Sequence, residues 1–273
     1  MSAHGGRNGG VRDRRTAPPL IGIDPAPVQP FAPLTRPQNR PSLSRTIQKR
    51  AFPMLTIHGV TRSRASRIVW LCHELGLPFR QEPVIQAYRL PDPDAPDARP
   101  NTHSPAFLAL SPAGAIPVIQ DDGLTLSESY ACTLHLARKY NANGIGPADD
   151  AEFAQMMQWT FYAIGAIEPD ALTILFLHAR GQAQSGEDQA MVAHAAERLV
   201  RPLTVLETHL ATHDHLVGGR FTVADLNMAE AVRYAQGYGA LMAQFPAVEA
   251  WLAACQARPA FQTMWQARLA EPE

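Results

Sequence analysis

The most informative stretch of the chain is residues 111–117, Ser111-Pro112-Ala113-Gly114-Ala115-Ile116-Pro117, followed ten positions later by Ser127-Glu128-Ser129. Proline at the start of a strand leaves neighbouring backbone N–H and C=O groups free to pair with a ligand. An acidic residue and a hydroxyl at a helix start can hold the charged end of a peptide, because the first N–H groups of a helix are unpaired. The two segments therefore predict a strand–turn–helix site for a charged peptide.

Outward from this stretch, residues 54–140 alternate between strand and helix patterns. Apolar residues repeat at helical spacing through residues 63–76, and Gly76 is a natural C-terminal stop. Asp121-Asp122-Gly123 has the composition of a hairpin turn. We expect strands at 54–60, 79–85, 117–120 and 124–126, helices at 63–76 and 127–140, and a loop at 88–105. This βαβ-ββα order resembles the thioredoxin-like α/β fold.

Beyond Gly146-Pro147 the strand patterns end, and the second half is predicted to be all-α. Its best marker is residues 219–225, in which Thr222 can cap a helix and Asp225 can reach back to the cap. Glu168-Pro169 predicts a kink in the first long helix. We expect helices at 151–180, 187–213, 222–237, 247–258 and 260–269.

Composition limits the classes to which the chain can belong. Hydrophobic residues make up 46% and charged residues 18%, with a net charge of −1, which is typical of a soluble globular protein. No run reaches the roughly 18 apolar residues that a membrane span needs. The three cysteines are widely spaced, which argues against a disulfide framework and fits a reducing compartment.

Residues 1–53 differ from the rest of the chain. They contain nine prolines and nine basic residues against two aspartates, so they carry +7 while the remainder carries −8. With no apolar period they cannot bury enough surface to offset the entropy of ordering, and we expect them to be disordered. Because Met54 directly precedes the first strand, we interpret the segment either as preceding the real start or as a dispensable extension. We expect no nucleic-acid partner for it.

Three motifs, in order, resemble those of the cytosolic glutathione transferase family, in its serine-type, bacterial-like form. They are S-x-x-x-R at Ser63 and Arg67, G-x-I-P with E-S at residues 114–129, and G-x-x-T-x-A-D at 219–225. The resemblance implies a thioredoxin-like glutathione-binding domain with a mixed four-stranded sheet at 54–141 and an all-α helical-bundle domain at 149–270. It further implies a cytoplasmic, detoxifying homodimer that conjugates the thiolate of its co-substrate glutathione to an apolar electrophile, without a metal or a membrane.

The resemblance assigns the catalytic role to Ser63, at the first turn of the first helix. A free thiol has a pKa of about 8.5, so the site must stabilise the reactive thiolate. The Ser63 hydroxyl can donate to the sulfur while the helix dipole adds favourable potential. The residue type alone favours a helix cap, and Thr61, Arg64 and Ser66 are neighbouring alternatives for the thiol contact. A cysteine-based redox site is disfavoured, because no C-x-x-C occurs at this helix start.

The resemblance also assigns residues that hold glutathione. Pro117 is implied to follow a cis bond, so that Ile116 offers its N–H and C=O to the cysteinyl unit. Glu128 and Ser129 are implied to take the ammonium and carboxylate of the γ-glutamyl end. Where many members have a basic residue for the glycyl carboxylate, this chain has Ala115. His103 or Arg99, in the preceding loop, is the candidate replacement.

Two further sets of side chains could form a functional site, an apolar cleft in one case and a metal site in the other, but each also has a purely structural interpretation. The first could line an apolar cleft but is more often core; it comprises Trp159, Phe161, Tyr162, Phe176, Tyr234 and Tyr238. The second, His209, His213, His215 and Asp214, has metal-ligand types but lies at a helix end, where histidines suit the dipole. Two other hypotheses remain: a catalytically silent binding module, or a related glutathione-dependent isomerase, peroxidase or dehalogenase.

Overall fold

The computed structural model describes residues 54–141, 143–179 and 181–271. A four-stranded mixed sheet in the order β2-β1-β3-β4 is the centre of the N-terminal domain. β1 is parallel to β2 and antiparallel to β3, and Ile57 pairs with both Gln81 and Ile119. The strands are β1 (Leu55–His58), β2 (Phe79–Glu82), β3 (Val118–Asp121) and β4 (Leu124–Ser127).

Helices α1 (Ala65–Leu75) and α3 (Ser129–Lys139) complete this domain. Gly76 ends α1 in the left-handed conformation, with φ of 61°. The β3–β4 hairpin turns through Asp122 and Gly123, both with positive φ, as a tight primed turn requires. Between β2 and β3 the chain forms the short helices η1 (Ala87–Arg89) and α2 (Pro105–Leu108).

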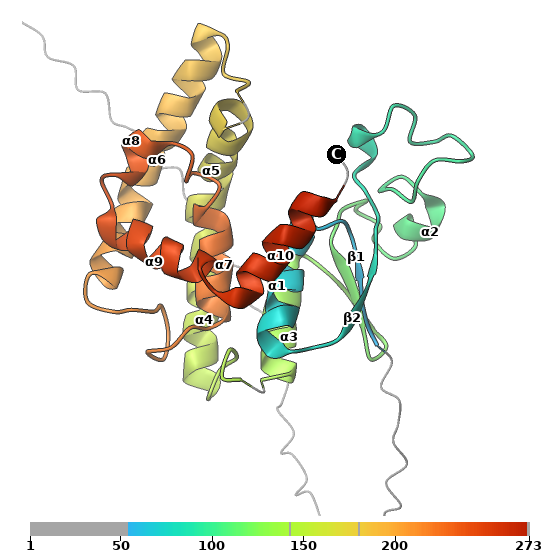
Figure 1. Ribbon diagram of the computed structural model, residues 1–273, viewed down its shortest axis with the longest axis horizontal. Coiled ribbons are helices and arrows are strands. Elements are labelled where there is room, and N and C mark those ends of the chain that lie inside the picture. The colour runs from blue at the N-terminus through green and yellow to red at the C-terminus, as the bar shows by residue number, and fades with distance from the viewer. Residues whose placement is uncertain (1–53, 142, 180, 272–273) are drawn as a thin grey trace, which may run out of the picture. The chain divides into compact units, whose positions relative to one another are not determined.

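The C-terminal domain is helical, and Figure 1 shows its last helix returning to lie along α1. Its long first helix contains two π-helical segments. The elements are α4 (Asp150–Tyr162), η2 (Ala163–Ile167), α5 (Glu168–Ile174), η3 (Leu175–Ala179), α6 (Gly186–Leu210), α7 (Val223–Val232), α8 (Gly239–Met242), α9 (Pro246–Gln256) and α10 (Pro259–Ala270).

The expected architecture, a thioredoxin-like domain followed by an all-helical domain, is confirmed. β2 ends earlier than predicted, at Glu82, because Pro83 follows it and Ile85 makes only an isolated bridge to Asn101. The predicted loop at 88–105 leads into α2, which has proline at its first position, and α8 was not predicted. The expected disordered extension at 1–53 lies outside the described residues.

The continuous helix Asp150–Ala179 is long and apolar enough, by length and composition alone, to cross a membrane. This differs from our expectation, which counted uninterrupted apolar residues. One face of the helix is packed into the protein core, with Met156, Ile167 and Ile174 fully buried. A core helix of a soluble protein satisfies the same two criteria.

Candidate active site

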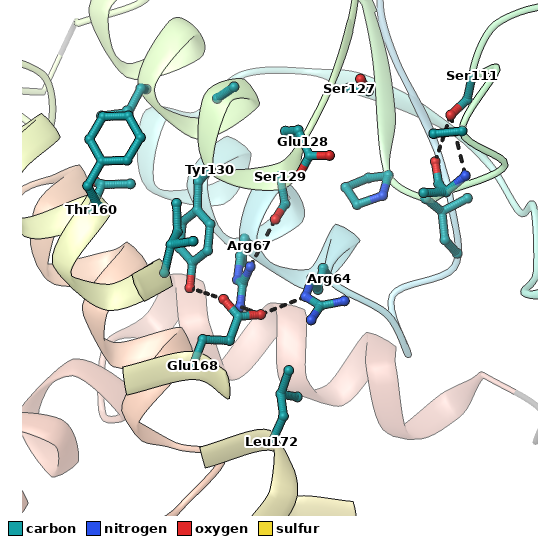
Figure 2. A pocket seen from close by; sticks show the side chains of 18 of the residues that line it. Arg64, Arg67, Ser111, Ser127, Glu128, Ser129, Tyr130, Thr160, Glu168 and Leu172 are labelled. Carbon is teal, nitrogen blue, oxygen red and sulfur yellow. Dashed lines mark hydrogen bonds and ion pairs between the residues drawn. The ribbon is translucent and has the colours of Figure 1, made fainter. Parts of the chain in front are cut away.

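A cavity of about 710 Å³ lies between the two domains. The start of α1, residues 111–117 and the β4–α3 junction contribute its first side, and α4, η2 and α5 contribute its second. The cavity is therefore lined by residues of both the 111–117 segment and the Ser127-Glu128-Ser129 segment. Figure 2 shows most of its lining side chains.

Residues 111–117 form a turn that is stabilised by hydrogen bonds between its own residues. The buried Ser111 hydroxyl donates to the Ala115 carbonyl at 3.1 Å and accepts from the Ala115 N–H at 3.4 Å. The Ile116–Pro117 peptide is cis, as the resemblance implies. Among the described residues, neither the N–H nor the C=O of Ile116 has a hydrogen-bond partner. Both groups are thus available to an extended ligand.

The β4–α3 junction places Glu128 and Ser129 on the cavity wall. Glu128 has φ of 68° and ψ of 108°, a conformation that non-glycine residues adopt rarely and that occurs often at binding sites. Its side chain is exposed, whereas Ser129, at the first position of α3, is buried. A carboxylate and a hydroxyl at an unpaired helix start suit a ligand that carries both an ammonium and a carboxylate.

Arg67 orients the Ser129 hydroxyl. This arginine is 0% exposed and donates from Nη1 to Ser129 Oγ at 2.9 Å. Because the Ser129 oxygen accepts from Arg67, its own proton remains for donation to a ligand. Arg67 itself is held by Glu168 at 3.2 Å, by Tyr234 at 3.3 Å and by the face of Tyr130, whose ring centroid is 4.0 Å away.

Glu168 connects the C-terminal domain to the N-terminal wall of the cavity. Its carboxylate accepts from Tyr130 Oη at 2.6 Å and from Arg64 Nε at 2.7 Å, in addition to pairing with Arg67 (Figure 2). Burial favours the neutral acid, but the charge of Arg67 and these hydrogen bonds outweigh it and lower the pKa of Glu168. Burial raises the pKa of Tyr130 well above its ordinary value, so its hydroxyl stays protonated and donates.

Ser63 lies immediately before α1 with its hydroxyl engaged by the backbone. Oγ donates to the Val60 carbonyl at 2.7 Å and accepts from the Ala65 N–H at 3.0 Å. Ser63 does not line the cavity, whereas the next residue, Arg64, does. The alternatives Thr61 and Ser66 are buried outside the cavity wall, where Ser66 donates to Glu230 at 2.9 Å.

His103 is also outside the cavity wall. Its Nδ1 is 3.5 Å from Asp94, and its backbone N–H donates to Asn101 Oδ1 at 2.8 Å. Arg99, the other candidate, is exposed and does not line the cavity either. The assignment of either residue to a glycyl carboxylate therefore stays a prediction.

Apart from Thr160 and Glu168, the lining residues of the second side of the cavity are apolar. Of the six aromatic residues considered from the sequence, Phe161 lines it and is 66% exposed. Trp159 instead packs edge-on against Tyr162 and His209. The other apolar lining residues of this side are Ile164, Pro169 and Leu172, while Leu134 of α3 lines the first side. An exposed apolar wall facing polar groups is typical of a site for a small organic molecule.

In the described part of the chain, no three His, Cys, Asp or Glu side chains are placed to hold a metal ion. The histidines at the end of α6 instead contact one another and the backbone: His209 and His213 stack with ring centroids 4.5 Å apart, and His209 Nε2 lies 3.1 Å from the His215 carbonyl oxygen. No local pattern in the sequence marks Arg64, Arg67 and Glu168 as a connected group. Of these, only Arg67 belongs to a recognised motif, and Glu168 is about a hundred residues away from it.

Comparison with known proteins identifies the family. Residues 62–139 match the model of the glutathione S-transferase N-terminal domain, and residues 154–259 match that of the C-terminal domain. Glutathione S-transferase 3 of Zea mays is 34% identical over 216 residues, which cover 76% of this chain and 91% of the relative. The chain belongs to the glutathione S-transferase family.

A solved structure and a second class of relative extend the comparison. The structure of glutathione S-transferase III in apo form superposes with a TM-score of 0.66 at 32% identity, covering 81% of this chain and 100% of that one. Elongation factor 1-gamma of Sus scrofa is 31% identical over 171 residues, which cover 59% of this chain and 37% of that protein.

Proposed function

We propose that the protein is a serine-type glutathione transferase that conjugates glutathione to a small apolar electrophile. In this reaction the thiol gives its proton to solvent and the thiolate attacks the electrophilic carbon. A new carbon–sulfur bond forms, and the leaving group departs with its electron pair. One observation carries the proposal: the Ile116–Pro117 turn, the Glu128–Ser129 pair and an exposed apolar wall share a single cavity.

Glutathione extends along the first side of the cavity in this proposal. The free N–H and C=O of Ile116 pair with the cysteinyl unit as an added strand would. Glu128 receives the γ-glutamyl ammonium, and Ser129 donates to its carboxylate. The electrophile occupies the opposite side, against Phe161, Ile164 and Leu172.

Ser63 is the proposed hydroxyl partner of the thiol. Its proton is directed at the Val60 carbonyl, so it must rotate toward the sulfur when glutathione binds. The cap of α1 need not be lost, because the oxygen can still accept from the Ala65 N–H. Ser63→Ala is therefore expected to lower kcat, and Ser66→Ala tests whether that effect is specific. Equal loss in both variants would remove Ser63 from this role.

The experiment that tests the class combines binding and turnover. We expect retention of the protein on immobilised glutathione and conjugation of a chloronitrobenzene substrate, with loss of retention in Glu128→Ala. Glu82→Ala is the matched control, because Glu82 lies on β2 outside the cavity wall. Absence of binding at millimolar glutathione would overturn the proposal. We also propose a cytoplasmic, detoxifying homodimer, for which light scattering should give twice the chain mass.

A catalytically silent binding module is the second candidate. The partial match to elongation factor 1-gamma, the engaged Ser63 hydroxyl and Ala115 favour it. Glutathione retention without turnover of any tested electrophile would support this candidate. Isomerisation of a maleyl compound would instead indicate an isomerase, reduction of a peroxide a peroxidase, and removal of halide from a haloalkane a dehalogenase. All of these related enzymes use the same glutathione thiolate.

A further inference from the structure

An ion-paired cluster with excess positive charge lies behind the N-terminal wall of the cavity. Its members, in order of contact, are Arg64, Glu168, Arg67, Glu230 and Arg233. Three arginines face two glutamates, so the cluster carries one positive charge that it does not itself neutralise. Placing such a charge near a desolvated site favours an anionic ligand.

Arg64 is the member that brings this charge to the cavity. The side chains of Arg67 and Arg233 are 0% and 7% exposed, whereas that of Arg64 is 47% exposed and lines the cavity. Arg64 uses Nε for Glu168, and its two Nη groups have no hydrogen-bond partner among the described residues. A guanidinium anchored through one nitrogen leaves its other donors oriented toward a ligand.

The position of Arg64 suits the thiol end of glutathione. It is the N-cap of α1, so the unpaired N–H groups of that helix add positive potential at the same place. Figure 2 shows its side chain reaching toward Glu168, on the same wall as Ser129 and Glu128. The Ile116–Pro117 turn, which is proposed to hold the cysteinyl unit, lines the same cavity.

We propose that Arg64 is a catalytic residue whose Nη groups donate hydrogen bonds to the glutathione thiolate, and that Glu168 positions it. The inference rests on the proposed function and adds a charged donor to the hydroxyl of Ser63. On ionisation the thiol proton passes to solvent and the sulfur keeps the electron pair. The guanidinium remains charged throughout, because arginine is not deprotonated in proteins.

The other ionisable groups on the cavity wall do not cancel this effect. They are Arg67, Glu128, Tyr130 and Glu168. The negative charge of Glu168 is shared between Arg67 and Arg64, and Tyr130 is neutral. Glu128 is assigned to the ligand's ammonium at the other end of glutathione. An opposite charge within hydrogen-bond reach lowers the pKa of a group by about one to three units.

The test measures the pKa of the bound thiol directly, from the ultraviolet absorbance of the thiolate in the glutathione complex as pH is varied. In Arg64→Gln we expect this pKa to rise by about one unit or more, and in Arg64→Lys by less. Arg80→Gln is the matched control. Arg80 is an exposed arginine paired with Glu82 at 3.2 Å and does not line the cavity, so the pKa should not change.

The outcomes separate this inference from the proposed function. Normal glutathione retention with an unchanged thiol pKa in Arg64→Gln would overturn the inference alone. No glutathione binding by the wild type would overturn both. If Arg64→Gln fails to fold, the double variant Arg64→Gln/Glu168→Gln is compared with Glu168→Gln. The thiol pKa is then expected to be higher in the double variant, and equal values would overturn the role of Arg64.

Discussion

At the scale of single residues, the contact between Arg67 and Ser129 fixes which hydrogen bond the Ser129 hydroxyl can offer to the cavity. A buried arginine costs free energy unless its donors are satisfied. Here Nη1 donates to Ser129, and Nη2 donates to Tyr234 and pairs with Glu168. Nε, in contrast, has no hydrogen-bond partner within the described structure and lies 3.9 Å from Glu230. The contact from Nη1 fixes the Ser129 oxygen as an acceptor toward Arg67. The serine is therefore preorganised to donate its proton into the cavity before any ligand arrives.

Ser129→Ala is expected to weaken glutathione binding by about 10-fold or more, because a hydrogen bond to a charged group contributes about 1.5–3 kcal/mol. Isothermal titration with glutathione measures the change. Ser185→Ala is the control: Ser185 caps α6 by accepting from the Asp188 N–H at 3.0 Å, so its loss should lower stability but not affinity. Equal affinity in Ser129→Ala and the wild type would contradict this role.

Contacts between side chains that are far apart in the sequence could not be predicted from the sequence alone. The motifs predicted Pro117, Glu128 and Ser129 from their local signatures, and all three line the cavity. Nothing local marks Glu168 as the partner of Arg64, Arg67 and Tyr130, since only the packing of the helical domain brings it there. Ser63 belongs to a clear motif, but the motif does not predict that its hydroxyl donates to the Val60 carbonyl, because that direction depends on how the loop folds.

At the scale of elements, one ion pair joins the start of α4 to the loop before α7. Arg220 donates from Nη1 and Nη2 to the two oxygens of Glu152 at 2.9 and 2.6 Å. Its remaining donors reach the carbonyls of Gly144 and Gly146 at 2.8 and 3.1 Å. The hydrogen bonds from Arg220, together with one from the Ala148 N–H, lower the pKa of Glu152 from 4.5 to about 2.

This shift predicts an acid-dependent contribution to stability. A carboxyl with a lower pKa in the folded state stabilises the fold fully above about pH 4.5 and loses that contribution as the pH falls toward about 2. Glu152→Gln should therefore cost up to about 1 kcal/mol near neutrality, and less in acid, since the pair is partly exposed. Urea unfolding at a series of pH values measures the free energy of unfolding of the wild type and of Glu152→Gln. A difference between the two proteins that does not change with pH would contradict this prediction.

The start of α7 is a buried capping box. Asp225 is fully buried and accepts from the Thr222 N–H at 2.9 Å, the Leu216 N–H at 3.0 Å and Trp251 Nε1 at 3.1 Å. Asp225→Ala leaves these donors without an acceptor and is expected to destabilise the protein by about 3 kcal/mol or more. Denaturant unfolding tests this, and Thr222→Ala should cost about 1–2 kcal/mol. A smaller loss in Asp225→Ala than in Thr222→Ala would be inconsistent with this network.

Elements with strong local signals were predicted well from the sequence. The Thr222–Asp225 capping box, the Gly76 stop and the Asp122-Gly123 turn are all confirmed. The π-helical segments at 163–167 and 175–179 and the short helix α8 could not be predicted. The first of these segments ends directly before Glu168-Pro169, where the sequence predicts a kink, because Pro169 has no N–H to donate within the helix.

At the scale of the whole described structure, α1 is shared by the two domains. One side of α1 packs on β1 and α3, and another packs on α10 and α7. Trp70 of α1 is fully buried, with its ring centroid 4.9 Å from that of Phe261 and 5.8 Å from that of Phe221. Glu74 of the same helix pairs with Arg258 at 2.6 Å. The helix that Arg64 precedes as N-cap is therefore held in place from both domains.

The N-terminal domain is consequently not expected to fold when separated. A fragment of residues 54–148 lacks α10, so it exposes the apolar face of α1, and burying one large aromatic side chain alone contributes about 2 kcal/mol or more. Trp70 is the only tryptophan in that fragment, so its fluorescence reports directly on this packing. We expect a red-shifted emission and no cooperative denaturant transition, whereas residues 54–273 should show both buried emission and one transition. A cooperative transition in the shorter fragment would mean that the contacts of α10 with α1 are dispensable, and the position of Arg64 would then be determined by the N-terminal domain alone.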